Sequence, residues 1–490
     1  MDDDIHIALP VYRGTDFIAE TVRSIRDQTY SRFRVMMSVD GADDPTIDLC
    51  RSFTDDPRFE LIVQPDRLGW PGNFNWLARR CDREFFCYWQ QDDLASTGYL
   101  ESLRNQLLLD PGASVAHTDV QWFGSKFHRD STEGVFGTPL ERVLQRIESI
   151  HYAPLRGLIR TSALPSGSDA IPTTPTGSTQ AEFVFLTALA AKGSFHRVTT
   201  AMYFKRAHRD NAHTAWFAEE PHRRRNEWIS TGVGMMRVAL PLAEPEQYGR
   251  LLATVLDRFA IERPGRGFFY APEQSETGVD TFVREFVDRA FESSSRIDLR
   301  TDDLVLGTGN GFERPVHPWI RTALEDQLAR ARTLRELNID AADGAIELST
   351  AAGGPGLSML GVGWSRPEPW GIWTEGSRAT IRLPAGQYTQ VVLTGAAFVP
   401  DHPVRVGYSS AGAEPSYVSV ADPVPITLAI DAPPERPHVE RALQLLLPDA
   451  CSPAAAGVST DGRVLGFGLT GITFVLDSVE PTDGEFPLPP

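Results

Sequence analysis

The first 120 residues alternate short apolar segments with stretches in which apolar residues recur at helical spacing. Between the first two apolar segments, Ile18, Val22 and Ile25 lie three or four positions apart, which predicts an amphipathic helix. The expected strands are Ile5–Leu9, Arg34–Val39, Glu60–Val63, Phe85–Trp89 and Ser114–His117. Strands that alternate with helices are typical of βαβ units and of a mostly parallel sheet. The N-terminal region is therefore expected to form an α/β, nucleotide-binding type of fold.

The pattern changes after about residue 160. Residues 162–179 are rich in Ser, Pro, Gly and Thr and predict a loop. The next apolar stretch, Glu182–Lys192, predicts a helix that Gly193 ends. Further along, stretches such as Tyr248–Phe259 and Val279–Phe291 have the periodicity of amphipathic helices and are broken by Pro and Gly. These helices predict a helical connector.

The C-terminal third has a different sequence pattern, with short β-rich runs separated by Gly and Pro turns. Such a pattern predicts a β-sandwich. The expected strands are Ile346–Leu348, Ala379–Leu383, Val391–Leu393 and Gly471–Val475. A chain of 490 residues is too long for one hydrophobic core. We expect three parts: an α/β domain over 1–234, a helical connector over 235–344 and a β-sandwich over 345–490.

The overall charge and the cysteines limit the classes of function. A formal net charge of -18 argues against nucleic acid as the main partner, because such binding neutralises phosphates with Lys and Arg. The four cysteines have no spacing typical of disulfides or zinc, which fits reduced thiols. No apolar stretch approaches the length that spans a bilayer. The expected location is the cytoplasm, with at most peripheral contact at the inner face of the plasma membrane.

Polar residues follow several of the predicted strands directly. Pro10 and Tyr12 follow the first, Asp40 the second, and Asp92 and Asp93 the strand that ends at Trp89. In open α/β sheets ligands bind beyond the carboxyl ends of the strands. These residues are therefore the first candidates for a binding site.

Five segments together resemble the family 2 glycosyltransferases in order and spacing. They are Ile7–Tyr12, Gln28–Tyr30, Ser38–Gly41, Arg67–Asn75 and Gln90–Asp93. The resemblance covers about residues 4–215. It implies a GT-A fold that binds a nucleoside diphosphate sugar, with a uridine diphosphate sugar as the expected donor, and a divalent ion, Mn²⁺ or Mg²⁺. Family 2 enzymes invert the configuration of the transferred sugar.

The resemblance implies a set of nucleotide-binding residues. They are Pro10, Tyr12, Asp40, Arg67, Asn75 and Gln91. Asp40 would accept hydrogen bonds from the nucleobase or the ribose. The alternative for Asp40 is an ordinary turn aspartate before a glycine.

The metal site implied by the resemblance departs from the usual pattern. The motif usually written DxD reads Gln90-Gln91-Asp92, so that its first acidic residue is an amide. Asp92 is the main expected ligand, with Asp93 and His208 as further ligands, since hard cations take oxygen ligands and imidazole also ligates metals. Arg206 is the expected contact of the diphosphate. Two Asp residues after a strand can also cap the next helix, which is the alternative.

Glu182 resembles the acidic residue that supplies the catalytic base of the family, although the usual acidic pair is reduced to one. In the alternative interpretation Glu182 only favours the dipole at the start of its helix. Asp169, in the preceding loop, is the next candidate for the base.

The segment Gly363–Trp373 is unusually rich in tryptophan and resembles a β-sandwich module that is appended to some bacterial glycosyltransferases. Exposed tryptophans would stack against sugar rings and make the module glycan-binding. Buried tryptophans would only fill the core. Both interpretations stay open at this point.

The sequence thus predicts an inverting, metal-dependent glycosyltransferase that moves a sugar to a hydroxyl of a cell-surface glycan or glycolipid. One alternative is a catalytically inactive glycan-binding or scaffold protein, because Gln90 and the single Glu182 reduce the acidic motifs. A glycoside hydrolase fits less well, since the acidic residues lie in a nucleotide-binding context.

Overall fold

The computed structural model describes residues 4–165, 171, 180–208, 220–263, 270, 272–291, 305–307, 313–336, 345–361, 363–384, 388–400, 402–410, 414–432 and 441–476. Asp169 lies outside these residues. The chain packs into two compact units, one of residues 1–279 and 298–321 and the other of residues 280–297 and 322–490. The division of the chain at 234 and 344 stays a prediction.

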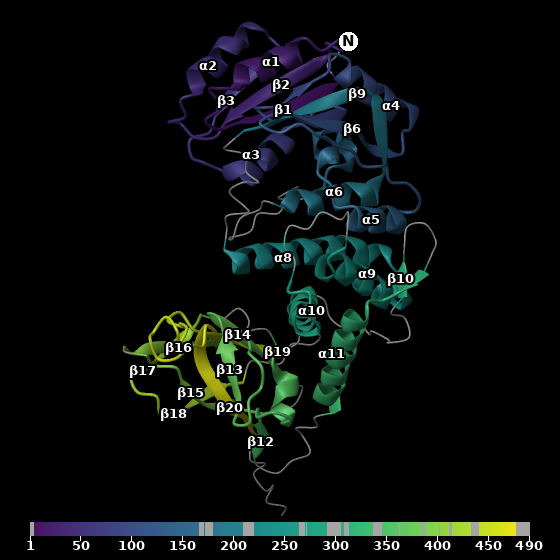
Figure 1. Ribbon diagram of the computed structural model, residues 1–490. Helices are drawn as coiled ribbons and strands as arrows, with labels where there is room; N and C mark the ends of the chain where they lie inside the picture. Colours follow the sequence, from purple (N-terminus) through teal and green to yellow (C-terminus); the bar gives the residue numbers. More distant parts are fainter. Residues whose placement is uncertain are drawn as a thin grey trace, which may run out of the picture. The chain divides into compact units, whose positions relative to one another are not determined.

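The first unit is built on a mixed nine-stranded sheet (Figure 1). Its strands are β1 (Ile5–Val11), β2 (Phe33–Val39), β3 (Phe59–Val63), β4 (Phe85–Tyr88), β5 (Leu94–Ala95), β6 (Ala113–Gly124), β7 (Arg129–Asp130), β8 (Leu158–Arg160) and β9 (Ser194–Ala207). Their order is β3-β2-β1-β4-β8-β6-β9-β5, with β7 paired to β6. Strands β3, β2, β1 and β4 are parallel, as the sequence predicts. Strand β8 runs antiparallel to β4 and β6, so the second half of the sheet is mixed.

Helices cover both faces of this sheet. They are α1 (Ile18–Arg26), α2 (Ile47–Ser52), α3 (Gly69–Ala78), α4 (Tyr99–Leu109), α5 (Pro139–Glu148) and α6 (Ala181–Lys192). Buried side chains of α1 and α4 join one face of β1, including Ile7 and Leu9. Those of α3 and α6 join the opposite face, where Ala8 and Phe86 lie. This alternation follows from the period of two along a strand.

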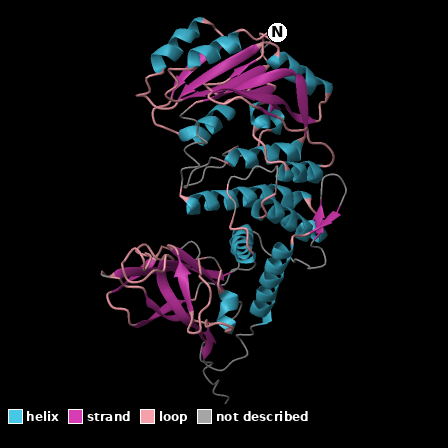
Figure 2. Ribbon diagram, viewed as in Figure 1, coloured by secondary structure: helices cyan, strands magenta, loops and turns pink. Residues whose placement is uncertain are grey.

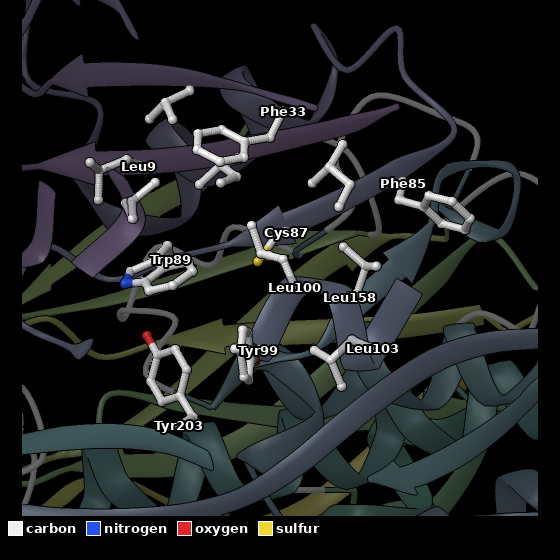
Figure 3. Close-up of a cluster of buried hydrophobic side chains, with 14 of the residues drawn as sticks. Leu9, Phe33, Phe85, Cys87, Trp89, Tyr99, Leu100, Leu103, Leu158 and Tyr203 are labelled. Carbon is white, nitrogen blue, oxygen red and sulfur yellow. The ribbon is translucent and has the colours of Figure 1, made fainter. Parts of the chain in front are cut away.

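An aromatic cluster fixes the end of β4 against β9 and α4 (Figure 3). The rings of Trp89, Tyr99 and Tyr203 are fully or almost fully buried and lie 5.7–5.9 Å apart, centroid to centroid, in tilted or edge-to-face pairs. Such pairs are favourable beyond the area they bury. The segment that carries the acidic motif therefore begins directly after a rigidly packed residue, Trp89.

The helical part of the chain is present as the periodicity predicts. Its helices are α8 (Pro221–Ala239), α9 (Tyr248–Ala260), α10 (Glu276–Phe291) and α11 (Pro318–Glu336), and a small hairpin pairs β10 (Val305–Gly307) with β11 (Glu313–Pro315). Helices α8 and α9 pack in the first unit, where the indole of Trp228 donates a hydrogen bond to the carbonyl of Phe259.

The second unit contains two antiparallel sheets. One orders β12 (Ala345–Ser349), β20 (Leu465–Val475), β15 (Gln390–Ala397) and β18 (Pro425–Asp431), with β13 (Ile372–Glu375) paired to β20. The other orders β14 (Arg378–Leu383), β19 (Arg441–Leu446), β16 (Val404–Ser410) and β17 (Ser416–Val420). Alternate residues of β14 and β15 are buried in one core between the sheets. This is the sandwich that the sequence predicts.

The predicted fold class is confirmed: α/β, then helices, then antiparallel sheets along the chain (Figure 2). Within the part of the chain that the structure describes, every helix is too short or too polar to cross a membrane.

Candidate active site

A cavity of about 380 Å³ lies at the carboxyl ends of β1, β2 and β4. This is the edge of an α/β sheet where ligands bind. Most of the predicted site residues line it, namely Pro10, Tyr12, Asp40, Arg67, Gln91, Asp92, Glu182 and His208. Further lining residues include Trp70, Asn73, Tyr88, Gln90, Arg156 and Lys205.

Asp40 organises the wall of the cavity next to β2. Its two carboxylate oxygens accept hydrogen bonds from the backbone N–H groups of Leu68, at 2.6 Å, and Gly69, at 3.0 Å. Gly69 has a φ of +70°, which favours glycine. Asp40 therefore fixes the turn that begins α3 and brings Trp70 to the cavity. A carboxylate oxygen can accept more than one hydrogen bond, so Asp40 keeps capacity for a ligand.

Gln91 and Tyr12 are joined by a reciprocal pair of hydrogen bonds. The Gln91 side chain accepts from the Tyr12 N–H and donates to the Tyr12 carbonyl, both at 2.8 Å. The guanidinium of Arg67 lies over the Tyr12 ring, 4.1 Å from its centroid. Gln91 thus ties the segment after β4 to the segment after β1, and Tyr12 and Arg67 form one stacked wall.

Helix α3 carries two asparagines, Asn73 and Asn75. Asn75 was the predicted nucleotide-binding residue, but Asn73 lines the cavity. Asn75 is buried, and its side-chain amide exchanges two hydrogen bonds of 2.8 Å with the backbone of Ile171. Asn73 lines the cavity and bonds to the side chain and carbonyl of Ser38. Asn75 therefore holds a neighbouring chain segment in place.

Asp92 and His208 meet at the cavity. The His208 Nε2 lies 2.8 Å from an Asp92 carboxylate oxygen, and both side chains are about one-fifth exposed. The imidazole also packs against the ring of Phe17, at 4.8 Å between centroids. The structure thus brings together an oxygen and a nitrogen ligand from residues more than a hundred positions apart.

Asp93 and Arg206 lie behind this pair, outside the set of described residues that line the cavity. Asp93 is fully buried and accepts a hydrogen bond of 2.9 Å from the Arg206 N–H. Burial and the neighbouring Asp92 carboxylate raise the pKa of Asp93. The Arg206 guanidinium donates to the Asp92 carbonyl and to Glu20. Both residues support the segment that carries Asp92.

Two buried cations that the sequence did not single out line the cavity. The Arg156 guanidinium donates to the side-chain oxygen of Gln90 at 2.7 Å, and its Nε lies 3.7 Å from an Asp93 oxygen. The Lys205 ammonium lies 4.5 Å and 4.7 Å from the ring centroids of Trp122 and Tyr152. Burial lowers the pKa of Lys205. The neutral Gln90 leaves more of the Arg156 charge uncompensated than an aspartate there would.

Glu182 lies in the first turn of α6 with its carboxyl group in the same cavity. The side chain is 7% exposed, and Oε2 has no hydrogen-bond partner among the described residues. Burial raises the pKa of Glu182 to about 7, although Arg156 and Lys205 act in the opposite direction. A buried carboxyl with one unpaired oxygen and a pKa near neutrality has the properties of a general base.

The Asp92–His208 pair can serve a divalent cation. Mg²⁺ in proteins is commonly held by one or two carboxylates together with substrate phosphates, and imidazole is also a metal ligand. Among the described residues no group of three or more His, Cys, Asp or Glu forms a complete ligand set. The two side chains therefore fit a metal whose remaining ligands come from a bound diphosphate.

Comparison with known proteins finds a family match in the N-terminal part of the chain. Residues 6–164 match the family described as Glycosyl transferase family 2. The resemblance inferred from the sequence motifs is therefore confirmed for this part of the chain.

Among particular proteins, the chain is similar to glycosyltransferase GlyA of Streptococcus pneumoniae serotype 4, with 22% identity over 136 residues. The match covers 28% of this chain and 18% of GlyA. A solved structure of S. aureus TarS 1-349 in complex with UDP-GlcNAc is 14% identical, with a TM-score of 0.41, and covers 66% of this chain and 92% of that one. The mannosyltransferase PcManGT of Pyrobaculum calidifontis, in complex with GDP-Man and Mn²⁺, is 15% identical, with a TM-score of 0.36, and covers 54% and 77%.

Proposed function

We propose that the first unit transfers a sugar from a nucleoside diphosphate donor, with UDP as the nucleotide, to a hydroxyl of a cell-surface glycan or glycolipid acceptor. The observation that carries the proposal is the buried carboxyl of Glu182 in the same cavity as the Asp92–His208 pair, with an Oε2 that has no hydrogen-bond partner among the described residues. The cavity residues from Pro10 to Arg156 lie in the segment that matches the family, whereas Glu182, Lys205 and His208 follow it in the chain. The choice of UDP rests on the family resemblance.

The nucleotide would bind along the wall formed by Tyr12, Arg67 and Asp40. The stacked Tyr12 and Arg67 side chains offer a flat face to a base, and the Arg67 guanidinium can donate to phosphate or carbonyl oxygens. Asp40 would accept a hydrogen bond from the base or the ribose while it holds the start of α3. Pro10 and Gln91 shape the floor between these groups.

The diphosphate would lie toward Asp92, His208, Arg156 and Lys205. A divalent ion held by Asp92 and His208 would neutralise negative charge on the leaving diphosphate. Arg156 contributes positive charge in a largely buried setting, where it acts more strongly than in water. Lys205, whose pKa burial lowers to about 7, adds positive charge while it is protonated. Gln90 replaces the first carboxylate of the usual metal motif. The positive charge of Arg156 and Lys205 would neutralise part of the diphosphate charge in its place.

Chemistry would proceed in a single displacement that inverts the anomeric carbon. The acceptor oxygen forms a bond to that carbon while the bond to the diphosphate oxygen breaks. Glu182 takes the proton of the acceptor hydroxyl. With a pKa of about 7, roughly half of the Glu182 side chains carry a charge at neutral pH and can accept it.

Turnover measurements test the proposal. Purified full-length protein is incubated with UDP-glucose or UDP-N-acetylglucosamine, Mn²⁺ and a panel of glycan acceptors, and UDP release is followed. Acceptor-dependent release in the wild type and its loss in Asp92→Ala support transfer. Tight UDP binding without acceptor-dependent release in any combination would favour the catalytically inactive alternative, and free sugar released from glycans without nucleotide would favour a hydrolase.

A further inference from the structure

The tryptophan-rich segment of the second unit forms a tight hairpin with an aromatic tip. Glu368 and Gly371 exchange backbone hydrogen bonds of 2.7 Å and 3.2 Å across the turn. Trp370, at the tip, is 41% exposed. Its indole N–H donates to a Glu368 carboxylate oxygen at 2.9 Å. A large apolar ring is thus held in one orientation on the surface.

Two further aromatic rings continue this surface. Trp373 on β13 lies 5.4 Å from Trp370 between ring centroids, at 70°, and 6.4 Å from Phe398, at 88°. Both Trp373 and Phe398 are only partly buried. Gly468 on β20 lies beneath the indoles, because a Cβ there would come within 3.0 Å of both. A side chain at this position would displace the rings.

Trp364 in the same segment has a different environment. Its side chain is 8% exposed, belongs to the sandwich core and donates to the Thr380 carbonyl. Core packing therefore accounts for Trp364 and leaves much of Trp370 uncovered. Since the orientation of Trp370 is already fixed, a ligand that stacks on it loses little further conformational entropy on binding.

Polar groups border the rings. The second carboxylate oxygen of Glu368 accepts from the Arg463 guanidinium at 3.3 Å, and Arg463 also pairs with Asp461 at 2.7 Å. The three side chains are each about one-third exposed, at 33%, 34% and 29%. Two carboxylates face one guanidinium here, so the three side chains together carry one net negative charge. This composition disfavours an anionic ligand and offers hydrogen-bond acceptors and donors to a neutral ligand with many hydroxyl groups.

We propose that the tryptophan patch, formed by Trp370, Trp373, Phe398, Glu368 and Arg463, is a binding site for the pyranose rings of a neutral, β-linked glycan. Equatorial substituents leave a flat C–H face that stacks on Trp370, while Trp373, at 70° to Trp370, contacts the edge of the sugar ring. The hydroxyl groups at the ring edge donate to Glu368 and accept from Arg463. The site lies in the second unit and binds without nucleotide, so it stands apart from the transfer proposed above.

The test uses full-length protein and two probes, cellohexaose and chitohexaose, without nucleotide or metal. Binding is measured by calorimetry and by the change in tryptophan fluorescence. The matched control is Tyr417→Ala, because Tyr417 is an exposed aromatic residue, at 51%, on β17 of the other sheet. The wild type and Tyr417→Ala bind at least one probe, whereas Trp370→Ala loses about tenfold or more in affinity, as expected for an anchoring tryptophan.

Two further variants keep the test decisive. Trp370→Phe retains a stacking ring and recovers part of the affinity, and Glu368→Gln weakens binding while the aromatic rings remain. UDP affinity stays unchanged in Trp370→Ala, which separates this site from the donor cavity. The proposal is overturned if neither probe binds the wild type, if Trp370→Ala and Tyr417→Ala bind alike, or if Trp370→Ala changes only the oligomeric mass or the thermal unfolding.

Discussion

Substitution of Glu182 by Gln separates catalysis from stability at the central residue of the site. Gln keeps the shape of the side chain and removes its ability to accept a proton. A general base contributes typically ~10²–10⁴-fold to the rate, and we expect Glu182→Gln to lose turnover within that range while UDP affinity stays within about twofold. In the wild type, kcat/KM should fall about tenfold per pH unit below pH ~7, because protonation of Glu182 removes the base.

The stability of the same variant has a defined dependence on pH. The pKa of Glu182 is raised from 4.5 to about 7, so the stabilisation that its proton provides is complete below pH 4.5 and is lost as the pH rises to about 7. At 1.36 kcal/mol per pH unit, the wild type loses at most about 3 kcal/mol over this window. Glu182→Gln has no titrating carboxyl at this position and does not lose this stability as the pH rises. Its unfolding free energy should therefore rise relative to the wild type between about pH 4.5 and about pH 7 and keep a constant difference above that range.

The assay pairs turnover with thermal unfolding across this range of pH. Glu101→Gln is the matched control, because Glu101 is also in the first turn of a helix, α4, but is exposed. The control should lose only ~0.3–1 kcal/mol, with no change in turnover. If Glu182→Gln behaves like this control, with near-normal turnover and a difference in stability that does not vary with pH, the base lies elsewhere and Asp169 is the next candidate.

Three further outcomes are expected. Asp92→Ala should abolish transfer with a small change in melting temperature, since its side chain is partly exposed; wild-type turnover would remove it from the site. Calorimetry should show UDP affinity at least about tenfold weaker when a chelator removes the divalent ion. The reason is that Asp92 and His208 alone leave most of a metal's ligand positions to the diphosphate. Equal affinity with and without chelator would exclude a metal in UDP binding. Lys205→Met should weaken UDP binding about tenfold in the absence of metal, while Lys126→Met, at an exposed lysine, should not; equal affinities would show that Lys205 does not face the diphosphate.

The sequence alone determined the arrangement of elements and the general place of the site. Apolar periodicity is a local property, so it predicted the strands β1–β4, helix α6 and the sandwich within a few residues. The rule that ligands bind at the carboxyl ends of parallel strands then placed Tyr12, Asp40 and Asp92 at one cavity. Glu182, predicted from its motif, lines the same cavity.

Only the tertiary structure decided which polar side chains face that cavity and which support it. Asn73 and Asn75 are two positions apart on α3, and packing turns Asn75 toward Ile171 and Asn73 toward the cavity. Arg156 is the last residue of a short 3₁₀ helix that carries no motif, and it reaches the site because β8 pairs with β4.

The same holds for the tryptophans of the sandwich, where Trp364 fills the core and Trp370 stands at a hairpin tip. The environment of the Glu182 carboxyl likewise depends on neighbours far along the chain. Long-range packing sets the burial, the hydrogen-bond partners and the pKa of a side chain. A local sequence pattern cannot predict these properties, because the neighbours that cause them lie far away in the sequence.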